Sequence, residues 1–140
     1  MEQNIYKREP LGVNGNGTPF KAVIVDDSAL ARQILRQSLL SVGFNIIDEI
    51  SNGQLAVQKL TSGNLIPDYL FVDMEMPGLN GGDVIKKVKP DIPKCKIIIV
   101  TSHSEKDIVQ EIITLGVDGY IKKPYNRDTV LKNLEKLKYG

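Results

Sequence analysis

From residue 21 onward, short apolar runs rich in β-branched residues alternate with longer stretches whose apolar residues recur at helical spacing. Apolar runs of about four residues are too short for helices and are typical of parallel strands buried on both faces. They predict strands over residues 22–25, 44–50, 69–72, 97–100 and 119–122. The stretches between them predict helices from a cap at Ser28 to a stop at Gly43, and over 54–60, 83–88, 104–115 and 127–138. This order of βαβ units indicates an α/β fold of the (βα)5 type around a parallel sheet.

The N-terminal residues lack this pattern. Residues 1–18 are rich in Gly and Asn and predict a flexible extension, which leaves residues 19–140 as the folded domain. Three glycines at 12, 15 and 17 resemble part of a nucleotide-binding pattern, but they precede the first strand instead of joining a strand to a helix. One domain accounts for the rest of the chain, so we expect no output module or membrane module within it.

The composition narrows the class of protein. Among 140 residues, 41% are apolar and 25% are charged, which is typical of a globular domain. The formal charge of +1, without blocks of like charge, argues against direct binding to nucleic acid or to a membrane surface. No window approaches the roughly 18 apolar residues that span a bilayer. The single cysteine, Cys95, cannot form an internal disulfide, so we expect a cytoplasmic protein.

Polar residues follow the predicted strands at their carboxyl ends, the edge where open parallel sheets bind ligands. These residues are Asp26, Asp27, Asp73, Thr101, Ser102, Lys122 and Lys123. Carboxylates brought close together repel and raise one another's pKa, so such a cluster is expected to hold a cation. Oxygen ligands favour Mg²⁺ or Mn²⁺ over zinc, and Mg²⁺ commonly binds phosphate oxygens as well. The edge therefore predicts a metal-assisted phosphoryl site.

Four motifs occur in order at these strand ends: Val25-Asp26-Asp27-Ser28, the segment from Val72 to Gly78 followed by Asn80-Gly81, Val100-Thr101-Ser102, and the segment from Gly119 to Pro124. Through them the chain from Phe20 to Tyr139 resembles the response-regulator receiver domains of two-component signalling, the CheY-like family. The resemblance implies a flavodoxin-like, doubly wound sheet with strand order 2-1-3-4-5. It also implies a phosphorylation-activated switch, not an enzyme, that assists its own phosphorylation and dephosphorylation.

The resemblance implies a role for each acidic residue. Asp73 would accept a phosphoryl group from a sensor histidine kinase or a histidine phosphotransfer protein. Asp27 would bind Mg²⁺ directly, and Asp26 would assist, often through water. Asp73 and the backbone carbonyl of Glu75 would complete the metal ligands from the protein, and Mn²⁺ could substitute for Mg²⁺. Hydrolysis of the aspartyl phosphate would reset the switch.

The resemblance also implies two phosphoryl-contacting residues and an aromatic switch. Lys123, which precedes Pro124, would contact the phosphoryl oxygens, whereas strand alternation turns Lys122 to the opposite face. The corresponding Lys-Pro peptide is commonly cis in the family. Thr101 would donate its hydroxyl to the phosphoryl group, and Tyr120 would swing inward when it does.

Two further positions flank the expected phosphoryl group. Glu75 lies two residues after Asp73, and His103 lies two residues after Thr101. Both are ionisable, and Glu75 could pair with a lysine or with the histidine. We expect them to modulate the phosphoryl lifetime, although a lone histidine is more often a solvated loop residue than a catalytic one.

The helix over residues 104–115 carries a wider apolar sector than docking on a sheet requires. Ile108 and Ile112 suit the core, whereas Val109 and Ile113 form a neighbouring stripe close to Tyr120. We expect these last three residues to belong to a partner surface on this helix, the following strand and the last helix. This surface would bind a downstream effector or a second copy of the chain. The alternative is that all of these side chains are buried.

Two other functions stay open. A haloacid-dehalogenase-like phosphatase also uses an aspartate at a strand end with Mg²⁺, but it needs a second Asp where this chain has Glu75. A receiver-like binding module that is never phosphorylated would usually lack one of the acidic or lysine positions. All of those positions are present here.

Overall fold

A computed structural model describes residues 10–139 of the chain, the last of them by its backbone alone. Its elements are β1 (Lys21–Val25), α2 (Ala29–Leu40), β2 (Asn45–Ile50), α3 (Gly53–Leu60), β3 (Tyr69–Asp73), α4 (Gly81–Val88), the 3₁₀ turn η1 (Lys89–Asp91), β4 (Lys96–Thr101), α5 (Glu105–Leu115), β5 (Gly119–Lys122) and α6 (Arg127–Tyr139). Every predicted strand and helix is present. Within this range, each helix is too short or too polar to cross a membrane.

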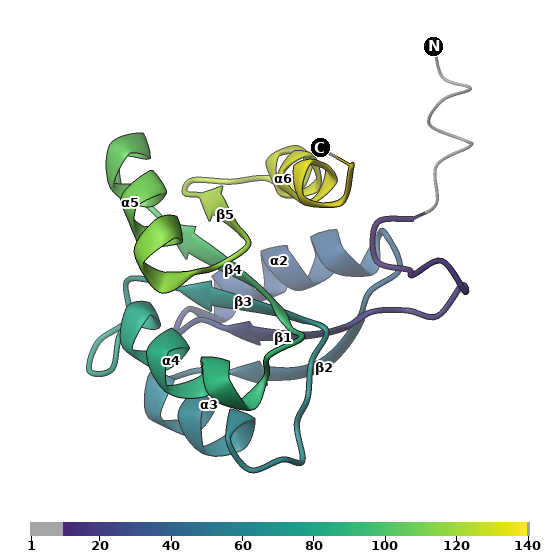
Figure 1. Ribbon diagram of the computed structural model, residues 1–140. Coiled ribbons are helices and arrows are strands. Elements are labelled where there is room, and N and C mark those ends of the chain that lie inside the picture. The colour runs from purple at the N-terminus through teal and green to yellow at the C-terminus, as the bar shows by residue number, and fades with distance from the viewer. Residues whose placement is uncertain (1–9, 140) are drawn as a thin grey trace.

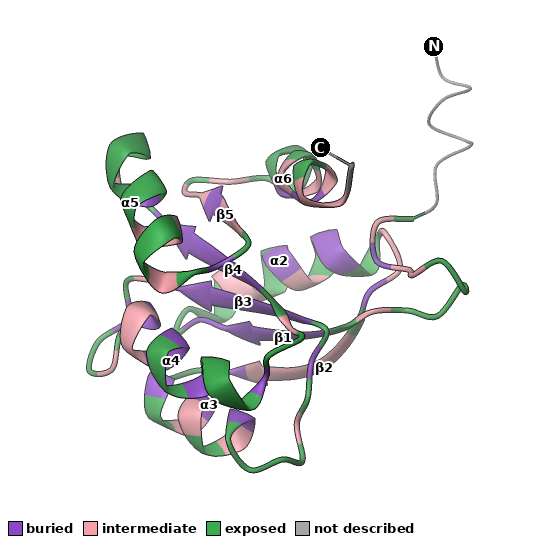
Figure 2. Cartoon of the chain, viewed as in Figure 1, coloured by how far each residue is buried: buried purple, intermediate pink, exposed green. Residues whose placement is uncertain are grey.

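The five strands form one parallel sheet in the order β2-β1-β3-β4-β5, which confirms the predicted fold class and strand order. Helices α2 and α6 cover one face of the sheet, and α3, α4 and α5 cover the other (Figure 1). The central strands are buried, whereas the helices expose their outer sides to solvent (Figure 2). Burial on both faces explains why these strands read as continuous apolar runs in the sequence.

Strand alternation divides the core into two clusters. In β1, Val23 and Val25 face the helices α3, α4 and α5, whereas Ala22 and Ile24 face α2 and α6. The same alternation repeats in β3 and β4. Because successive side chains point to opposite faces, a one-residue shift of register would exchange the two clusters. The packing therefore fixes where each strand ends, and with it the position of the polar residues beyond that end.

Helix α4 begins earlier than the sequence pattern predicts. The prediction started the helix at Asp83, whereas the structure starts it at Gly81. The side chain of Asn80 accepts a hydrogen bond of 3.0 Å from the Asp83 backbone N–H and caps the helix. An Asn at the N-cap fixes the start, and Gly81 and Gly82 form the first two helical positions.

Part of the segment before β1 packs on the domain, although its composition predicts a flexible extension. The backbone N–H of Gly12 donates to the Val42 carbonyl at 2.8 Å, and that of Phe20 donates to the Gly12 carbonyl at 2.7 Å. Leu11 and Phe20 pack against the core cluster under α2 and α6. Apolar burial of Leu11 and the paired backbone of Gly12 thus place this part of the segment against the domain, whereas residues 15–18 are exposed and residues 1–9 lie outside the described range.

One glycine lets helix α4 approach the end of strand β3. A Cβ on Gly81 would overlap the Asp73 carbonyl oxygen and would lie 2.8 Å from the Met74 Cα. A Cβ on the neighbouring Gly82 would come no closer than 3.4 Å to the Asn80 Oδ1. Only the first glycine is therefore required by close packing against the backbone that carries Asp73.

We predict that Gly81→Ala lowers the free energy of unfolding by about 1–3 kcal/mol, because the added methyl group must displace backbone atoms. The matched variant Gly82→Ala should leave it unchanged or raise it by up to about 1 kcal/mol, since alanine favours helix. Urea unfolding monitored by circular dichroism measures both values. Equal stability of the two variants would contradict the close approach of α4 to β3.

Candidate functional site

Three carboxylates meet at the carboxyl edge of the sheet. Asp26 and Asp27 directly follow β1, and Asp73 is the last residue of β3, the strand that pairs with β1. Carboxylate oxygens of the three residues all lie within 4.8 Å of one another. Asp26 and Asp73 are buried, with exposed fractions of 4% and 3%, whereas Asp27 is exposed. The structure thus brings together the acidic cluster that the strand ends predict.

The buried carboxylate of Asp26 is held in an unfavourable environment. Burial raises the pKa of Asp26 from 3.8 to about 6, and the nearby Asp73 and Asp27 charges add to the rise. The Ser28 backbone N–H opposes it, because it donates a hydrogen bond of 2.9 Å to the Asp26 carboxylate. A cluster in this condition is stabilised by any bound cation.

Lys123 supplies a positive charge to this cluster. Its Nζ lies 2.8 Å from Asp73 Oδ1 and 3.3 Å from Glu75 Oε1. Burial alone lowers the pKa of Lys123, but the hydrogen bond and charge of Asp73 and the charge of Glu75 outweigh it and raise that pKa. Lys122 points away and donates to the His103 carbonyl, and the peptide between Lys123 and Pro124 is cis. The predicted orientations of both lysines and the expected cis bond are confirmed.

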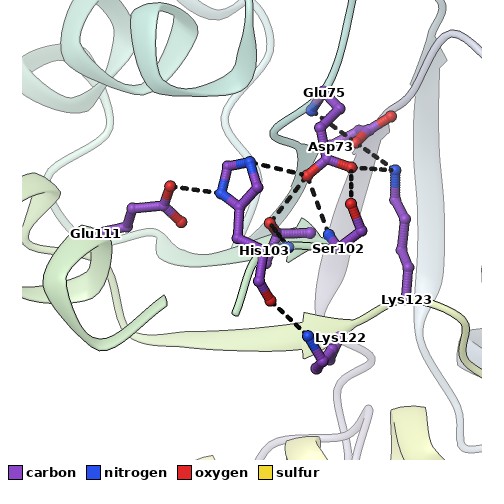
Figure 3. A network of polar contacts seen from close by, with 8 residues as sticks. Asp73, Glu75, Ser102, His103, Glu111, Lys122 and Lys123 are labelled. Atoms are coloured by element: carbon purple, nitrogen blue, oxygen red, sulfur yellow. Dashed lines mark hydrogen bonds and ion pairs between the residues drawn. The ribbon is translucent and has the colours of Figure 1, made fainter. Parts of the chain in front are cut away.

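The carboxylate of Glu75 lies in the middle of a polar network (Figure 3). Glu75 Oε2 accepts hydrogen bonds of 3.0 Å from the Thr101 hydroxyl and from the Ser102 backbone N–H, and Oε1 accepts one of 2.9 Å from the Ser102 hydroxyl. Burial alone raises the pKa of Glu75, but the hydrogen bonds from Ser102 and Thr101 and the charge of Lys123 lower it to about 2. Glu75 is therefore ionised at neutral pH.

His103 bridges Glu75 and helix α5 (Figure 3). Its Nε2 lies 3.3 Å from Glu75 Oε2, and its Nδ1 lies 2.6 Å from Glu111 Oε2. The prediction placed Glu75 and His103 beside the site, and the structure does so. The prediction from the sequence gave no role to Ser102 beyond its place at a strand end, and it did not name Glu111. Glu111 lies three residues after Ile108, so helical periodicity indicates which side of the helix it occupies. Periodicity cannot show which loop faces that side.

The expected switch and partner residues lie beside this network. Thr101 is fully buried at the end of β4, and Tyr120 of β5 is partly buried and packs against the core cluster under α3, α4 and α5. On α5, Val109 and Ile113 are exposed by 56% and 75%, whereas Ile108 is fully buried. The division of this helix into a core side and an outward apolar stripe is therefore confirmed.

Sequence comparison places the chain in a known family. The family model described as the response regulator receiver domain matches residues 22–135. The chain belongs to the response regulator receiver family. Two chemotaxis proteins CheY, from Pseudomonas aeruginosa and from Thermotoga maritima, are each 33% identical to it, over 120 and 117 residues. These matches cover 84% of this chain and 95% and 96% of the two relatives.

Solved structures of similar proteins show the same receiver fold. The crystal structure of the CheX-CheY-BeF₃-Mg²⁺ complex from Borrelia burgdorferi matches with a TM-score of 0.84 and 28% sequence identity, covering 95% of this chain and 100% of that one. The chemotaxis response regulator CheY4 of Vibrio cholerae matches with a TM-score of 0.73 and 27% identity, covering 84% of this chain and 98% of that one. These proteins thus share the (βα)5 fold over most of this chain.

The donor atoms of this receiver domain fit a hard divalent cation. The three clustered carboxylates offer oxygen ligands only, and their oxygens are close enough together to share one ion. Mg²⁺ and Mn²⁺ prefer such ligands. The carboxylates line an open groove that continues past Leu30 and Ile34 of α2 to Tyr125, so the site can be reached from solvent.

We predict that Asp26→Asn stabilises the metal-free receiver at pH 7 by about 1–3 kcal/mol, because it removes a buried charge whose folded-state pKa is raised. The wild-type carboxylate takes up its proton at a higher pH when folded, near 6, than when unfolded, near 3.8. The difference in the free energy of unfolding between Asp26→Asn and the wild type should therefore shrink as the pH falls from about 6 to 4. Urea unfolding of both proteins in a chelator, at several pH values, measures it. A stability difference that does not change with pH would contradict this prediction.

Proposed function

We propose that this receiver domain is a signalling switch that accepts a phosphoryl group on Asp73. The observation that carries the proposal is the contact of Lys123 Nζ with Asp73 Oδ1 at 2.8 Å, next to a cluster of three carboxylates that suits a divalent cation. Phosphoryl transfer proceeds through a transition state whose charge lies on the peripheral oxygens, so fixed cations and hydrogen-bond donors supply most of the catalysis. Lys123 and the Thr101 hydroxyl are groups of this kind.

The proposed donor is a phosphohistidine of a sensor kinase or of a phosphotransfer protein. A carboxylate oxygen of Asp73 forms the new P–O bond while the P–N bond of the donor breaks. The electron pair of the broken bond remains on the donor's imidazole nitrogen. Asp73 Oδ1 is already oriented by Lys123 and by the Glu75 backbone N–H, which donates to it at 3.0 Å. In the reset step, water attacks phosphorus and returns the free carboxylate and inorganic phosphate.

Asp26, Asp27 and Asp73, with the backbone carbonyl of Glu75, are the proposed ligands of Mg²⁺, for which Mn²⁺ could substitute. When bound, the cation would neutralise charge on the phosphoryl oxygens and on the acidic cluster. Burial, and to a smaller extent the charges of Asp73 and Asp27, raise the pKa of Asp26, and a bound cation would offset both effects, which supports this assignment.

The proposed output runs from Thr101 to the surface formed by α5, β5 and α6. A phosphoryl group adds about two negative charges and new acceptor oxygens, which would attract the Thr101 hydroxyl. Tyr120, one strand away, would fill the space that this side chain leaves. The pairing of β4 with β5 supports the coupling, because it sets Tyr120 opposite Ile99, two residues before Thr101. Glu75 and His103 are proposed to modulate the phosphoryl lifetime from their positions beside Asp73.

Val109 and Ile113, together with Tyr120, are proposed to bind a downstream protein. The observation that favours this surface is the exposure of Val109 and Ile113 on the outer side of α5, since large apolar side chains are exposed there to solvent. The relative from Borrelia burgdorferi was solved in a complex of CheX and CheY, and by analogy we favour a separate effector protein over a second copy of this chain. We propose no direct contact with nucleic acid or membrane, and we place the protein in the cytoplasm.

The two alternatives identified from the sequence are less well supported. A module that is never phosphorylated has no need for the acidic cluster and the lysine that contacts it. A dehalogenase-like phosphatase would need a second Asp at position 75, whereas the carboxylate there is a Glu bound to Ser102. We therefore propose a phosphoacceptor that assists its own chemistry and does not turn over an external substrate.

Replacing Asp73 with Asn should abolish phosphorylation by acetyl phosphate or by phosphohistidine donors in the presence of Mg²⁺, because the amide cannot form the acyl phosphate. Intact-mass spectrometry should show one added phosphoryl group on the wild type and none on the variant. Circular dichroism checks that the fold is retained. Equal labelling of the Asp73→Asn variant would overturn the assignment of the phosphoacceptor.

Polar substitution at Val109 or Ile113 should weaken binding of the effector protein while lowering the free energy of unfolding by less than about 1 kcal/mol, because these side chains lie outside the core. The matched control Ile108→Ala, on the buried side of the same helix, should cost about 2–5 kcal/mol. Urea unfolding gives the stabilities, and analytical ultracentrifugation with and without beryllofluoride tests self-association. Large losses of stability in the Val109 and Ile113 variants would contradict a surface role for these residues. If the wild type dimerises with beryllofluoride and the polar variants do not, the partner is a second copy of the chain.

A further inference from the structure

The Glu75 carboxylate contacts the groups that the proposed function assigns to a phosphoryl group. Thr101 and Lys123 are the proposed phosphoryl-contacting residues, and both are within hydrogen-bond distance of Glu75 oxygens, at 3.0 and 3.3 Å. The Ser102 backbone N–H and hydroxyl complete the set at 3.0 and 2.9 Å. The Glu75 carboxylate therefore has four donors from three residues, all at the edge of the sheet beside Asp73.

Lys123 links this carboxylate directly to the phosphoacceptor. Its Nζ is shared between Asp73 Oδ1 at 2.8 Å and Glu75 Oε1 at 3.3 Å. A phosphoryl group on Asp73 would add terminal oxygens beside the same ammonium group. The Glu75 carboxylate and those oxygens carry like charge and need the same donors, so both cannot occupy them at once.

We propose that Glu75 is an internal placeholder that occupies the phosphoryl-binding donors in the unphosphorylated receiver and must leave them when Asp73 is phosphorylated. This inference rests on the proposed function and adds a competing side chain to it. In the resting state the Glu75 carboxylate accepts hydrogen bonds from the Thr101 hydroxyl and the Ser102 N–H. It also opposes phosphorylation, because its contacts must be broken first.

The side chain of Glu75 can make this exchange. It is 34% exposed, so a path to solvent is open, whereas the Thr101 and Asp73 side chains are buried and fixed by the sheet. A phosphoryl group offers about two negative charges and three terminal oxygens, against one charge and two oxygens for the carboxylate. The same donors therefore favour the phosphoryl group once it is covalently held at Asp73.

His103 gives the exchange a route to helix α5. Its ring lies between Glu75 Oε2 at 3.3 Å and Glu111 Oε2 at 2.6 Å, with one nitrogen directed at each. Departure of Glu75 removes one of these two carboxylate partners and leaves His103 with the one on α5. The helix that carries the exposed Val109 and Ile113 is thus in contact with the group that responds to the exchange.

The test compares beryllofluoride binding by the wild type, Glu75→Ala and Glu75→Gln at saturating Mg²⁺, using ¹⁵N-labelled protein. The dissociation constant for beryllofluoride should be about tenfold lower for Glu75→Ala than for the wild type. In the variant, contacts worth one or two charge-assisted hydrogen bonds no longer have to be broken. The dissociation constant of Glu75→Gln should lie between those of the wild type and Glu75→Ala, since its amide oxygen still accepts hydrogen bonds but carries no charge. The glutamine variant also keeps the test valid should the alanine variant not fold.

The Ser102 amide resonance reports on the exchange independently of affinity. Without beryllofluoride, it should differ between the wild type and Glu75→Ala, because only the wild type has a carboxylate on that N–H. At saturation the two resonances should coincide, since beryllofluoride then holds the same donors in both proteins. Ser102 is far from position 75 along the chain, so the substitution itself does not shift its amide through neighbouring bonds.

The control Asp91→Asn removes one negative charge from the turn η1, which precedes β4 and lies at the opposite edge of the sheet. Its affinity should equal that of the wild type, and the advantage of Glu75→Ala should persist at about 0.5 M salt, where long-range charge effects are screened. Affinities of wild type and Glu75→Ala within twofold of each other, or Ser102 resonances that still differ at saturation, would overturn the placeholder. Failure of every variant to bind beryllofluoride would instead overturn the proposed function, and the placeholder with it.

Discussion

The edge of the sheet must accommodate three carboxylates whose oxygens lie within 4.8 Å of one another, two of them on buried side chains. Burial of the Asp26 carboxylate, and repulsion from the like charges of Asp73 and Asp27, raise its pKa, and this rise expresses the cost of the arrangement. Lys123 offsets part of it through its ion pair with Asp73. The rest of the structure depends on this constraint, because the sheet must hold both the acidic residues and their compensating cation in place.

The parallel sheet meets the constraint by register and alternation. Pairing of β3 with β1 and β4 brings Asp73 to the same edge as the end of β1 and next to Val100. Pairing of β4 with β5 sets Lys122 opposite Thr101, so that Lys123 lies one residue further along, over the carboxylates. Lys122 follows the alternation to the other side, where its ammonium group contacts the His103 carbonyl. The two adjacent lysines thus have different environments because side chains alternate along the strand, although their chemistry is the same.

The loops beyond the strands add what the sheet does not determine. Glu75 and His103 each lie two residues past a strand end, and each is fixed by contacts with another loop or helix instead of by pairing in the sheet. This arrangement joins the acidic edge to α5 through side chains alone. A scaffold shared with the CheY relatives can therefore support different local networks, because the loop residues can change without affecting the two core clusters.

The sequence by itself determined the strands, the helices and the edge at which the chemistry lies, because burial on both faces of a parallel sheet leaves continuous apolar runs with polar residues at their ends. It also predicted the different orientations of Lys122 and Lys123, since alternation is a local property of a strand. The strand order came from the resemblance to receiver domains, and the structure agrees with it.

Only the tertiary structure decided how side chains far apart in the chain meet. The hydrogen bond from Ser102 to Glu75 and the contact of His103 with Glu111 join residues of different elements, and no spacing along the chain encodes them. The packing of Leu11 against the core was hidden for the same reason, because the composition of its segment is that of a solvated tail. Periodicity reports which side of its own element a residue faces, whereas the identity of its neighbour depends on how separate elements pack together.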